Sequence, residues 1–338
     1  MVPVTILFLI IILFRIQVTS GAVNGFILFV QLIDVMITDA NGYIHTNFKI
    51  LIFIKAYRFI YRIFNLEFFT VDELSFCIWK GATTMDVLAV KYITIVYALL
   101  LVAVTIVIMK LCTIKCFKLS VKGSIIHGLS AFFVICYAQC TKVTLLVITP
   151  VRVYRMGFGK VEKVVYYQGD LPYMKGEHLI YAIPAVVFLV VFVLVPPILL
   201  LVYPLCYKVF ALLRIEETRV IKLTCRFIPL EKMKPLFDSF QSCFKDNYRF
   251  MAGFYFLYRF STQATFVLTN SFTVFYVILE TQLIIMLTIQ AAVHAYRKDW
   301  HNILDILLFA NLAIINICLL YTSPSPRDAT LSRMPSSA

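Results

Sequence analysis

The sequence predicts an all-α fold, a polytopic bundle of transmembrane helices. Of its 338 residues, 61% are hydrophobic and 14% are charged, whereas a soluble domain is about 45–50% apolar and about 25% charged. A soluble globule of this size could not bury so much apolar surface. Apolar segments recur to the end of the chain, so a signal peptide does not explain the composition. We therefore expect an integral membrane protein, in the plasma membrane, and exclude a soluble enzyme.

Six segments are long and apolar enough to cross a bilayer, which takes about 20 residues of helix. They are Tyr92–Leu111, Ile125–Ile148, Leu179–Tyr203, Phe250–Leu268, Phe272–Val293 and a truncated Asn302–Ile317.

Residues 1–69 are expected to contribute one to three further spans, of less regular pattern. Val2–Phe14 is short for a span, and Phe48–Phe69 contains basic residues in an amphipathic pattern that suits either a span or an interfacial helix. Gly21–Ile37 is apolar but is interrupted by polar side chains, which are Asn24, Gln31 and Asp34.

The positive charge indicates the orientation of the helices. The chain has 31 Lys and Arg against 18 Asp and Glu, a net charge of +13. No basic patch lies outside a hydrophobic context, so we expect no nucleic-acid partner. Basic residues concentrate in connections 110–124, 207–249 and 294–301. Because basic loops favour the cytoplasmic side, these three are predicted to be cytoplasmic, and Leu66–Val90 and Thr149–His178 to lie outside.

We expect one transmembrane helical domain over residues 1–317, truncated at both ends. Within it, residues 207–249 form a basic cytoplasmic juxtamembrane segment that would contact acidic lipid or a cytoplasmic protein. The composition changes abruptly over residues 318–338, and Cys318–Asp328 and Leu331–Ala338 look like the in-frame translation of a sequencing adapter. We interpret residues 318–338 as a disordered assembly artefact; the alternative is a Ser/Pro-rich natural tail.

No motif for catalysis or metal binding appears. The sequence has no HExxH zinc motif, no P-loop and no Gly-x-Ser-x-Gly elbow. Its nine cysteines lack paired metal-ligand spacing, and most lie in apolar runs, where Cys behaves as a small buried hydrophobe. The expectation is therefore no enzymatic activity, no metal and no cofactor.

Three cysteines are candidates for modification. Cys112 and Cys116 lie beside lysines at the predicted cytoplasmic end of a span, which suits S-palmitoylation; the alternative is two free thiols. Cys77 lies in a predicted outside loop and is a candidate for an extracellular disulfide with a partner that is not part of this chain.

Charged residues within apolar spans are the candidate functional residues, because a charge near the bilayer centre costs about 2.5–3.5 kcal/mol. Arg259 and Glu280 have predicted depths that differ by about 5 Å, so adjacent antiparallel helices would let them pair. Lys142 lies in the outer half of its span. Asp305 lies near the inner start of the last span, where a basic side chain of 294–301 would reach it. These residues either lock helices together or line a polar path for an ion or solute.

Prolines interrupt one predicted span, at Pro184, Pro196, Pro197 and Pro204. Each proline frees a carbonyl that water or a neighbouring side chain must satisfy. The pattern suits a gate or cavity, and equally a bend that is stabilised by packing.

Several stretches resemble one family. They are Leu66–Cys77, Pro235–Arg249 with Ala252, Gly253 and Tyr255–Arg259, and Trp300–Asp305 with Asn311 and Leu312. They are similar to the transient-receptor-potential-like (TRP-like) C-terminal membrane domain of large invertebrate and protist surface proteins, related to fungal TRP-like membrane proteins. The likeness covers most of residues 1–317 and is most specific over Phe237–Arg259.

The resemblance implies a polytopic domain that follows a long Cys-rich ectodomain. It implies a cation channel or sensor, since fungal relatives have been linked to calcium handling and flavin transport, and it carries over no ligand or filter residue. The alternatives are a non-conducting anchor or signalling element of an adhesive ectodomain protein, and a carrier of a small solute such as a flavin. The conducted ion, the stimulus and the oligomeric state stay open, and a homo-oligomer is compatible with the sequence.

Overall fold

The computed structural model describes most of the helical domain. The described residues are 10–11, 17–40, 84–112, 121–154, 161–165, 168–212, 230–269 and 271–322. The predictions for Cys77, Cys116, Phe48–Phe69 and most of Val2–Phe14 lie outside these ranges.

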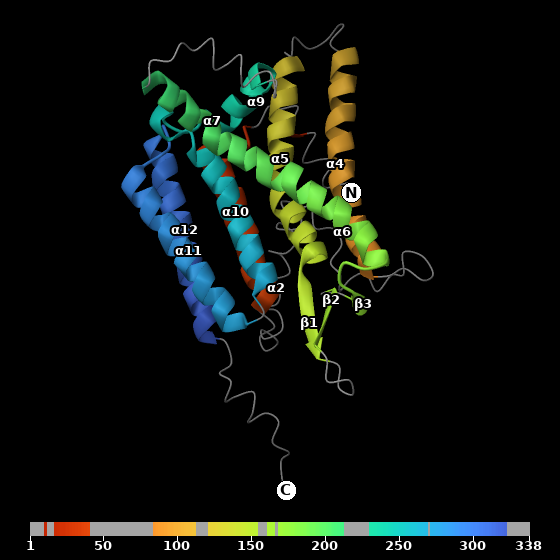
Figure 1. Ribbon diagram of the computed structural model, residues 1–338. Helices are drawn as coiled ribbons and strands as arrows, with labels where there is room; N and C mark the ends of the chain where they lie inside the picture. Colours follow the sequence, from red (N-terminus) through yellow and green to blue (C-terminus); the bar gives the residue numbers. More distant parts are fainter. Residues whose placement is uncertain are drawn as a thin grey trace.

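Helices dominate the described residues, which confirms the predicted all-α class (Figure 1). In chain order they are α2 (Gly21–Ala40), α4 (Thr84–Cys112), α5 (Val121–Ile148), α6 (Glu177–Phe188), α7 (Val195–Leu212), α9 (Leu230–Gln241), α10 (Met251–Leu268), α11 (Phe272–Val293) and α12 (Asp299–Thr322). A π-helical segment, Leu189–Leu194, joins α6 to α7, and a 3₁₀ turn, Asp246–Tyr248, precedes α10.

Four helical segments are long and apolar enough to cross a membrane, which supports a multipass membrane protein. They are Gly128–Ile148, Glu177–Pro204, Thr273–Val293 and Asp299–Tyr321. The prediction of six spans is wrong for the described residues. In α10, Arg259 and Gln263 lower the hydropathy of a helix of only 18 residues. In α4, the apolar segment among the described side chains is Ala89–Thr105, which like Gly21–Met36 in α2 is shorter than a full span.

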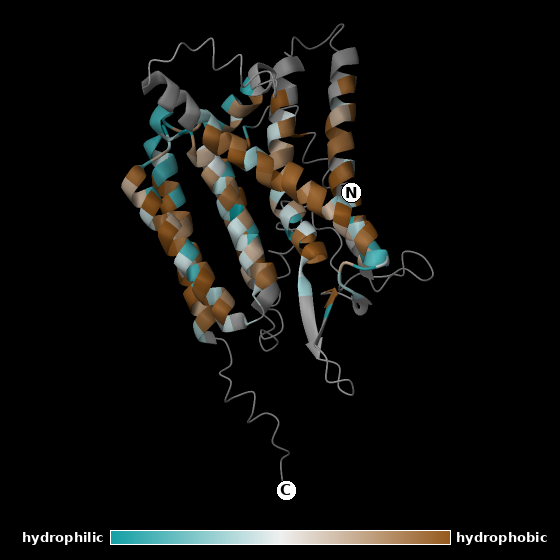
Figure 2. Ribbon diagram, viewed as in Figure 1, coloured by the Kyte–Doolittle hydropathy of each residue, from teal (hydrophilic) through white to brown (hydrophobic). Residues whose placement is uncertain are grey.

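α5 is the central helix of the bundle. Of its apolar segment 89% is buried, against 22–33% for the other three membrane-length segments. α5 packs against α4 and α10, α10 packs against α7, and α12 packs against both α2 and α11. The outer helices carry exposed Leu, Ile and Val side chains along α4, α6, α7, α11 and α12, visible as brown ribbon in Figure 2. Such surfaces are stable in contact with lipid tails.

Side chains from other helices satisfy two carbonyls that prolines free along the α6–α7 segment. Pro197 has no N–H to donate to the carbonyl of Val193, four residues earlier, and the hydroxyl of Tyr137 on α5 donates to that carbonyl at 2.9 Å. Pro204 frees the carbonyl of Leu200 in the same way, and Nε2 of Gln241 on α9 donates to it at 3.1 Å. At both positions the structure therefore favours packing around a bend over a gate or cavity.

A small antiparallel sheet occupies part of the segment that the sequence analysis treats as an outside loop. It consists of β1 (Pro150–Tyr154), β2 (Val161–Val165) and β3 (Gln168–Pro172), in the order β1-β2-β3. In the β1–β2 register, Arg152 pairs with Lys163. His178 at the start of α6 anchors this end, because its Nε2 lies 3.0 Å from the carbonyl of Val147.

The described residues that begin and end the three basic connections lie at one end of the bundle, as predicted (Figure 1). Figure 1 shows the end of α4, the start of α5, α9 and the α11–α12 connection at the top, and the sheet at the opposite end. Which end faces the cytoplasm stays a prediction. α12 continues past Ile317 to Thr322, with Leu319 and Leu320 packed against the core. The interpretation of residues 318–338 as an artefact also stays a prediction.

Candidate functional site

Polar side chains from α2, α5, α10, α11 and α12, all buried except the part-buried Glu280, form a polar core inside the bundle. We define the polar core by its members, which are Asn24, Gln31, Asp34, Lys142, Tyr255, Arg259, Glu280, Gln290, Asp305 and Asn316. Tyr255, Arg259 and Gln263 follow one another at intervals of four residues on α10, so they share one helix face. That face meets α2, the helix that the sequence left uncertain as a span.

Arg259 is held by neutral partners on α2. Its side chain is 1% exposed. Its Nε donates to Oε1 of Gln31 at 3.0 Å, and its Nη2 donates to Oδ1 of Asn24 at 2.8 Å. The amide of Gln31 is itself oriented, because its Nε2 donates to the carbonyls of Val134 and Ile135 on α5, both at 3.4 Å. Arg259 Nη1 has no hydrogen-bond partner among the described residues.

Asp305 accepts its hydrogen bond from a residue of α10 and not from the basic connection 294–301. It is 2% exposed, and Oδ2 accepts a hydrogen bond from the hydroxyl of Tyr255. Nε2 of Gln290 on α11 donates to the same hydroxyl. A Cβ at Gly25 would lie 2.6 Å from Asp305 Oδ1, so a larger residue here would displace the Asp305 carboxyl group. The expected ion pair between Asp305 and the basic connection is not found among the described residues: Arg297 bonds to the carbonyl of Phe244 and to Asp246 instead.

Glu280 does not pair with Arg259 in the structure, contrary to the depth argument. Its Oε2 accepts a 2.8 Å hydrogen bond from Nδ2 of Asn316 on α12. The physical reason is helix rotation, since equal depth does not make two side chains face each other. α10 directs Arg259 toward α2, while α11 directs Glu280 toward α12.

Lys142 pairs with Asp34, which in the sequence stands out only as a polar residue that interrupts an apolar segment. Its Nζ lies 3.9 Å from Oδ2 of Asp34 on α2 and 5.5 Å from the centre of the Phe266 ring. The polar core therefore contains a lysine–carboxylate pair between α5 and α2, next to the arginine of α10.

The polar partners on α2 are the residues that sequence reasoning missed as site members. Asn24, Gln31 and Asp34 are spaced seven and three residues apart, which places them on one helix face. That spacing is the signal that predicts their shared orientation.

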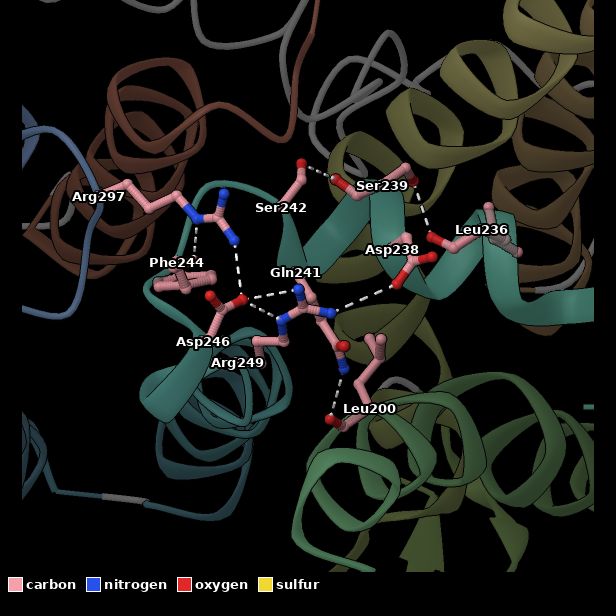
Figure 3. Close-up of polar contacts among 10 residues, drawn as sticks. All are labelled: Leu200, Leu236, Asp238, Ser239, Gln241, Ser242, Phe244, Asp246, Arg249 and Arg297. Atoms are coloured by element: carbon pink, nitrogen blue, oxygen red, sulfur yellow. Dashed lines mark hydrogen bonds and ion pairs between the residues drawn. The ribbon is translucent and has the colours of Figure 1, made fainter. Parts of the chain in front are cut away.

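A second polar feature lies where the helices end, at the basic end of the bundle (Figure 3). Oδ1 of Asp246 accepts hydrogen bonds from Arg249, at 3.0 Å from Nε and 2.7 Å from Nη2, and from Arg297 Nη2 at 2.8 Å. The hydrogen bond from Arg249, followed by the charges of Arg249 and Arg297, lowers the pKa of Asp246 from its ordinary value of 3.8. One carboxylate thus joins the segment before α10 to the α11–α12 connection.

Backbone hydrogen bonds join the same two segments, and we call this contact the junction. The amide of Lys245 donates to the carbonyl of Ala295 at 2.9 Å, and the amide of Arg297 donates to the carbonyl of Cys243 at 3.0 Å. The rings of Phe244 and Tyr296 stack with their centroids 4.8 Å apart. Burial raises the pKa of the Cys243 thiol to about 12, so this thiol stays protonated and unreactive at neutral pH.

A pocket of about 410 Å³ opens beside this junction. It is lined by Lys234, Asp238, Ser242, Arg249 and Arg297, which we call the helix-end pocket. Lys234, Asp238 and Ser242 recur every four residues, so α9 and its C-terminal extension present them on one face. Phe237, Phe240 and Phe244 are buried. The amphipathic pattern of α9 thus fixes one wall of the pocket.

Within the described residues, no group of three or more His, Cys, Asp or Glu side chains could hold a metal ion. Cys112 is the last residue of α4. Comparison with family models, with curated proteins and with solved structures finds no match to this chain, so the resemblance to the TRP-like membrane domain stays a prediction.

Proposed function

We propose that the chain is the membrane domain of a TRP-like surface protein that acts as a cation channel or sensor, with the polar core as its ion path. The observation that supports this most is the set of ionisable side chains within the helical bundle: Asp34, Lys142, Arg259 and Asp305, which are buried, and Glu280, which is part-buried. Each such charge costs several kcal/mol in a membrane. A passive anchor would gain stability by losing them, so a function that needs them is favoured.

The identity of the partners also favours an ion path. A purely structural arginine would pair directly with an acid, whereas Arg259 bonds to two neutral amides. Arg259 Nη1, Glu280 Oε1 and Gln263 Oε1 make no hydrogen bond to any described residue. Such buried polar atoms are costly to leave unpaired, so the core has hydrogen-bonding capacity that a passing cation and its water would use.

The sign of the charge favours cations over anions. The polar core holds three carboxyl groups, those of Asp34, Glu280 and Asp305, against the two cations Lys142 and Arg259. An excess of carboxylate along a path attracts cations and repels anions.

Bilayer recordings test the proposal. The purified chain, reconstituted in planar bilayers under a KCl gradient, is expected to carry a current whose reversal potential lies near that of potassium. Asp305→Asn and Glu280→Gln remove carboxylates and are expected to shift the reversal potential toward that of chloride. Glu177→Gln is the control, because Glu177 is exposed at the start of α6. Unchanged reversal potentials in both variants would contradict the assignment of the path.

A non-conducting anchor or signalling element is the second candidate, and one observation favours it. Tyr137 and Gln241 satisfy the carbonyls that Pro197 and Pro204 free, so packing stabilises this proline-containing segment. This candidate predicts that correctly folded wild-type protein carries no current in the same recordings. The small-solute carrier stays an alternative, and uptake of a radiolabelled flavin into the same liposomes would distinguish it.

A further inference from the structure

The helix-end pocket has the position and chemistry of a lipid headgroup site. We propose that it binds the headgroup of an anionic phospholipid that carries both a phosphate and an ammonium group, of the phosphatidylserine type. This inference does not depend on the proposed ion path.

The pocket presents cations from three separate segments. Lys234 comes from α9, Arg249 from the turn before α10, and Arg297 from the α11–α12 connection, and all three line the same space of about 410 Å³. This volume is in the range of small-molecule sites, about 300–1,000 Å³. Planar guanidinium groups match the oxygens of a phosphate, and a lysine adds a point charge.

The two guanidinium groups are held in place before any ligand arrives. Asp246 accepts hydrogen bonds from both Arg249 and Arg297, and the carbonyl of Phe244 accepts a further bond from Arg297 Nε at 2.9 Å (Figure 3). These bonds leave other N–H groups of each guanidinium available to a ligand. Because the side chains are already ordered, a ligand loses less affinity to their immobilisation.

One acid in the pocket favours a headgroup that also carries a positive charge. Oδ1 of Asp238 lies 3.7 Å from Arg249 Nη1, an ion pair that is too long for a hydrogen bond. A bare phosphate would meet this carboxylate as a like charge, whereas an ammonium group would pair with it. With Asp246 included, the three cations exceed the two acids by one charge, which complements a headgroup with a net charge of −1.

The pocket also lies at the depth of lipid headgroups. It is built where α9, α10, α11 and α12 begin or end, at the basic end of the bundle (Figure 1). Trp300, the second residue of α12, is 54% exposed, and exposed Trp marks the membrane–water interface. If this end is cytoplasmic, as predicted, it faces the leaflet that is rich in anionic lipid.

The test measures lipid binding to the purified full chain in neutral detergent. Short-chain phosphatidylserine, phosphatidylglycerol and phosphatidylcholine with identical acyl chains are titrated, and native mass spectrometry reads the bound fraction. Phosphatidylserine is expected to bind most tightly and phosphatidylcholine least. Lys234→Gln is expected to weaken binding of both anionic lipids about fivefold. Asp238→Asn is expected to weaken phosphatidylserine alone, because phosphatidylglycerol has no ammonium group.

The controls separate this pocket from diffuse attraction and from a site for soluble anions. Lys298→Gln removes an exposed charge at the same end but outside the pocket lining, and it is expected to leave all three affinities unchanged. An equal loss in Lys298→Gln and Lys234→Gln would overturn the proposal, as would equal affinities for all three lipids. Inorganic phosphate or phosphoserine that binds as tightly as the lipid would overturn the lipid assignment. Thermal unfolding confirms that each variant is folded.

Discussion

The hydroxyl of Tyr137 on α5 donates a 2.9 Å hydrogen bond to the carbonyl of Val193, the group that Pro197 leaves without its helical partner. The π-helical segment between α6 and α7 is therefore stabilised by a residue more than 50 positions away in the chain. Tyr137 also packs edge-on against Phe256 of α10, with ring centroids 4.9 Å apart, so one side chain joins three helices.

Tyr137→Phe is expected to lower the free energy of unfolding by about 1–2 kcal/mol, because it leaves the buried carbonyl of Val193 unpaired. The ring contact with Phe256 is retained in this variant. Denaturation in mixed micelles measures the change. Tyr321→Phe serves as the control, since Tyr321 is 85% exposed. Equal stability of wild type and Tyr137→Phe would show that the carbonyl finds another partner.

Gly253→Ala is expected to destabilise the contact between α10 and α7. A Cβ at this position would lie 2.6 Å from both the backbone amide nitrogen of Leu201 and the carbonyl oxygen of Pro197. Because these atoms belong to the backbone, one helix must move away from the other, at a cost of about 1–3 kcal/mol. The same denaturation experiment measures this loss in the free energy of unfolding.

Two further variants show whether the cost of Gly253→Ala comes from this contact. Ala291→Val adds volume at an exposed position of α11 and is expected to have no effect. Leu201→Ala in the Gly253→Ala background is not expected to restore stability, and a full rescue would contradict the backbone contact.

Hydropathy predicts the lengths of the apolar helices well. The predicted span Phe272–Val293 has the same bounds as α11, because a polar segment ends the apolar run on each side. The predicted span in α10 fails because hydropathy is averaged along a helix, and the polar face of α10 lowers that average. In α4 the described apolar segment, Ala89–Thr105, is shorter than a full span, although the sequence stays apolar as far as Met109.

The partners within the polar core were harder to predict, for a geometric reason. Distance along the sequence gives the depth of Arg259 and Glu280, but the rotation of each helix decides which neighbour each side chain meets. The helix-end pocket was beyond prediction for a related reason. Lys234, Arg249 and Arg297 span more than 60 residues and meet only through tertiary packing. No local sequence pattern therefore predicts that they line one pocket.

Gln31→Leu is expected to destabilise the protein by about 1.5–3 kcal/mol, the usual value of a hydrogen bond to a charged group. The variant leaves Nε of the buried Arg259 without its partner. Gln17→Leu is the control, because Gln17 is exposed just before α2.

A double-mutant cycle isolates the contact between Gln31 and Arg259. Arg259→Met is expected to cost less stability in the Gln31→Leu background than in the wild type, with a coupling energy of about 0.5–3 kcal/mol. Strict additivity of the two changes would show that the 3.0 Å contact between them contributes nothing.

Acid is expected to weaken the junction at Asp246. The hydrogen bond from Arg249 holds the pKa of Asp246 in the folded protein below its ordinary value of 3.8. A carboxyl group with a lowered folded pKa stabilises the fold at pH values above the unfolded pKa. That stabilisation is lost as the pH falls through the folded pKa. The junction should therefore be intact at neutral pH and loosen below about pH 4.

Hydrogen–deuterium exchange of the backbone amides at the junction measures this loosening. The amides of Lys245 and Arg297, which bond across the junction, are expected to lose protection as the pH falls from 5 to 3, after correction for intrinsic exchange rates. In Asp246→Asn the same amides should be less protected at neutral pH, and their protection should not change with acid. Asp299→Asn alters an exposed acid at the start of α12 and provides the control. Because Asp246 orients both guanidinium groups of the helix-end pocket, a pH-dependent loss of protection in wild type but not in Asp246→Asn would place the acid sensitivity of this end at one carboxylate.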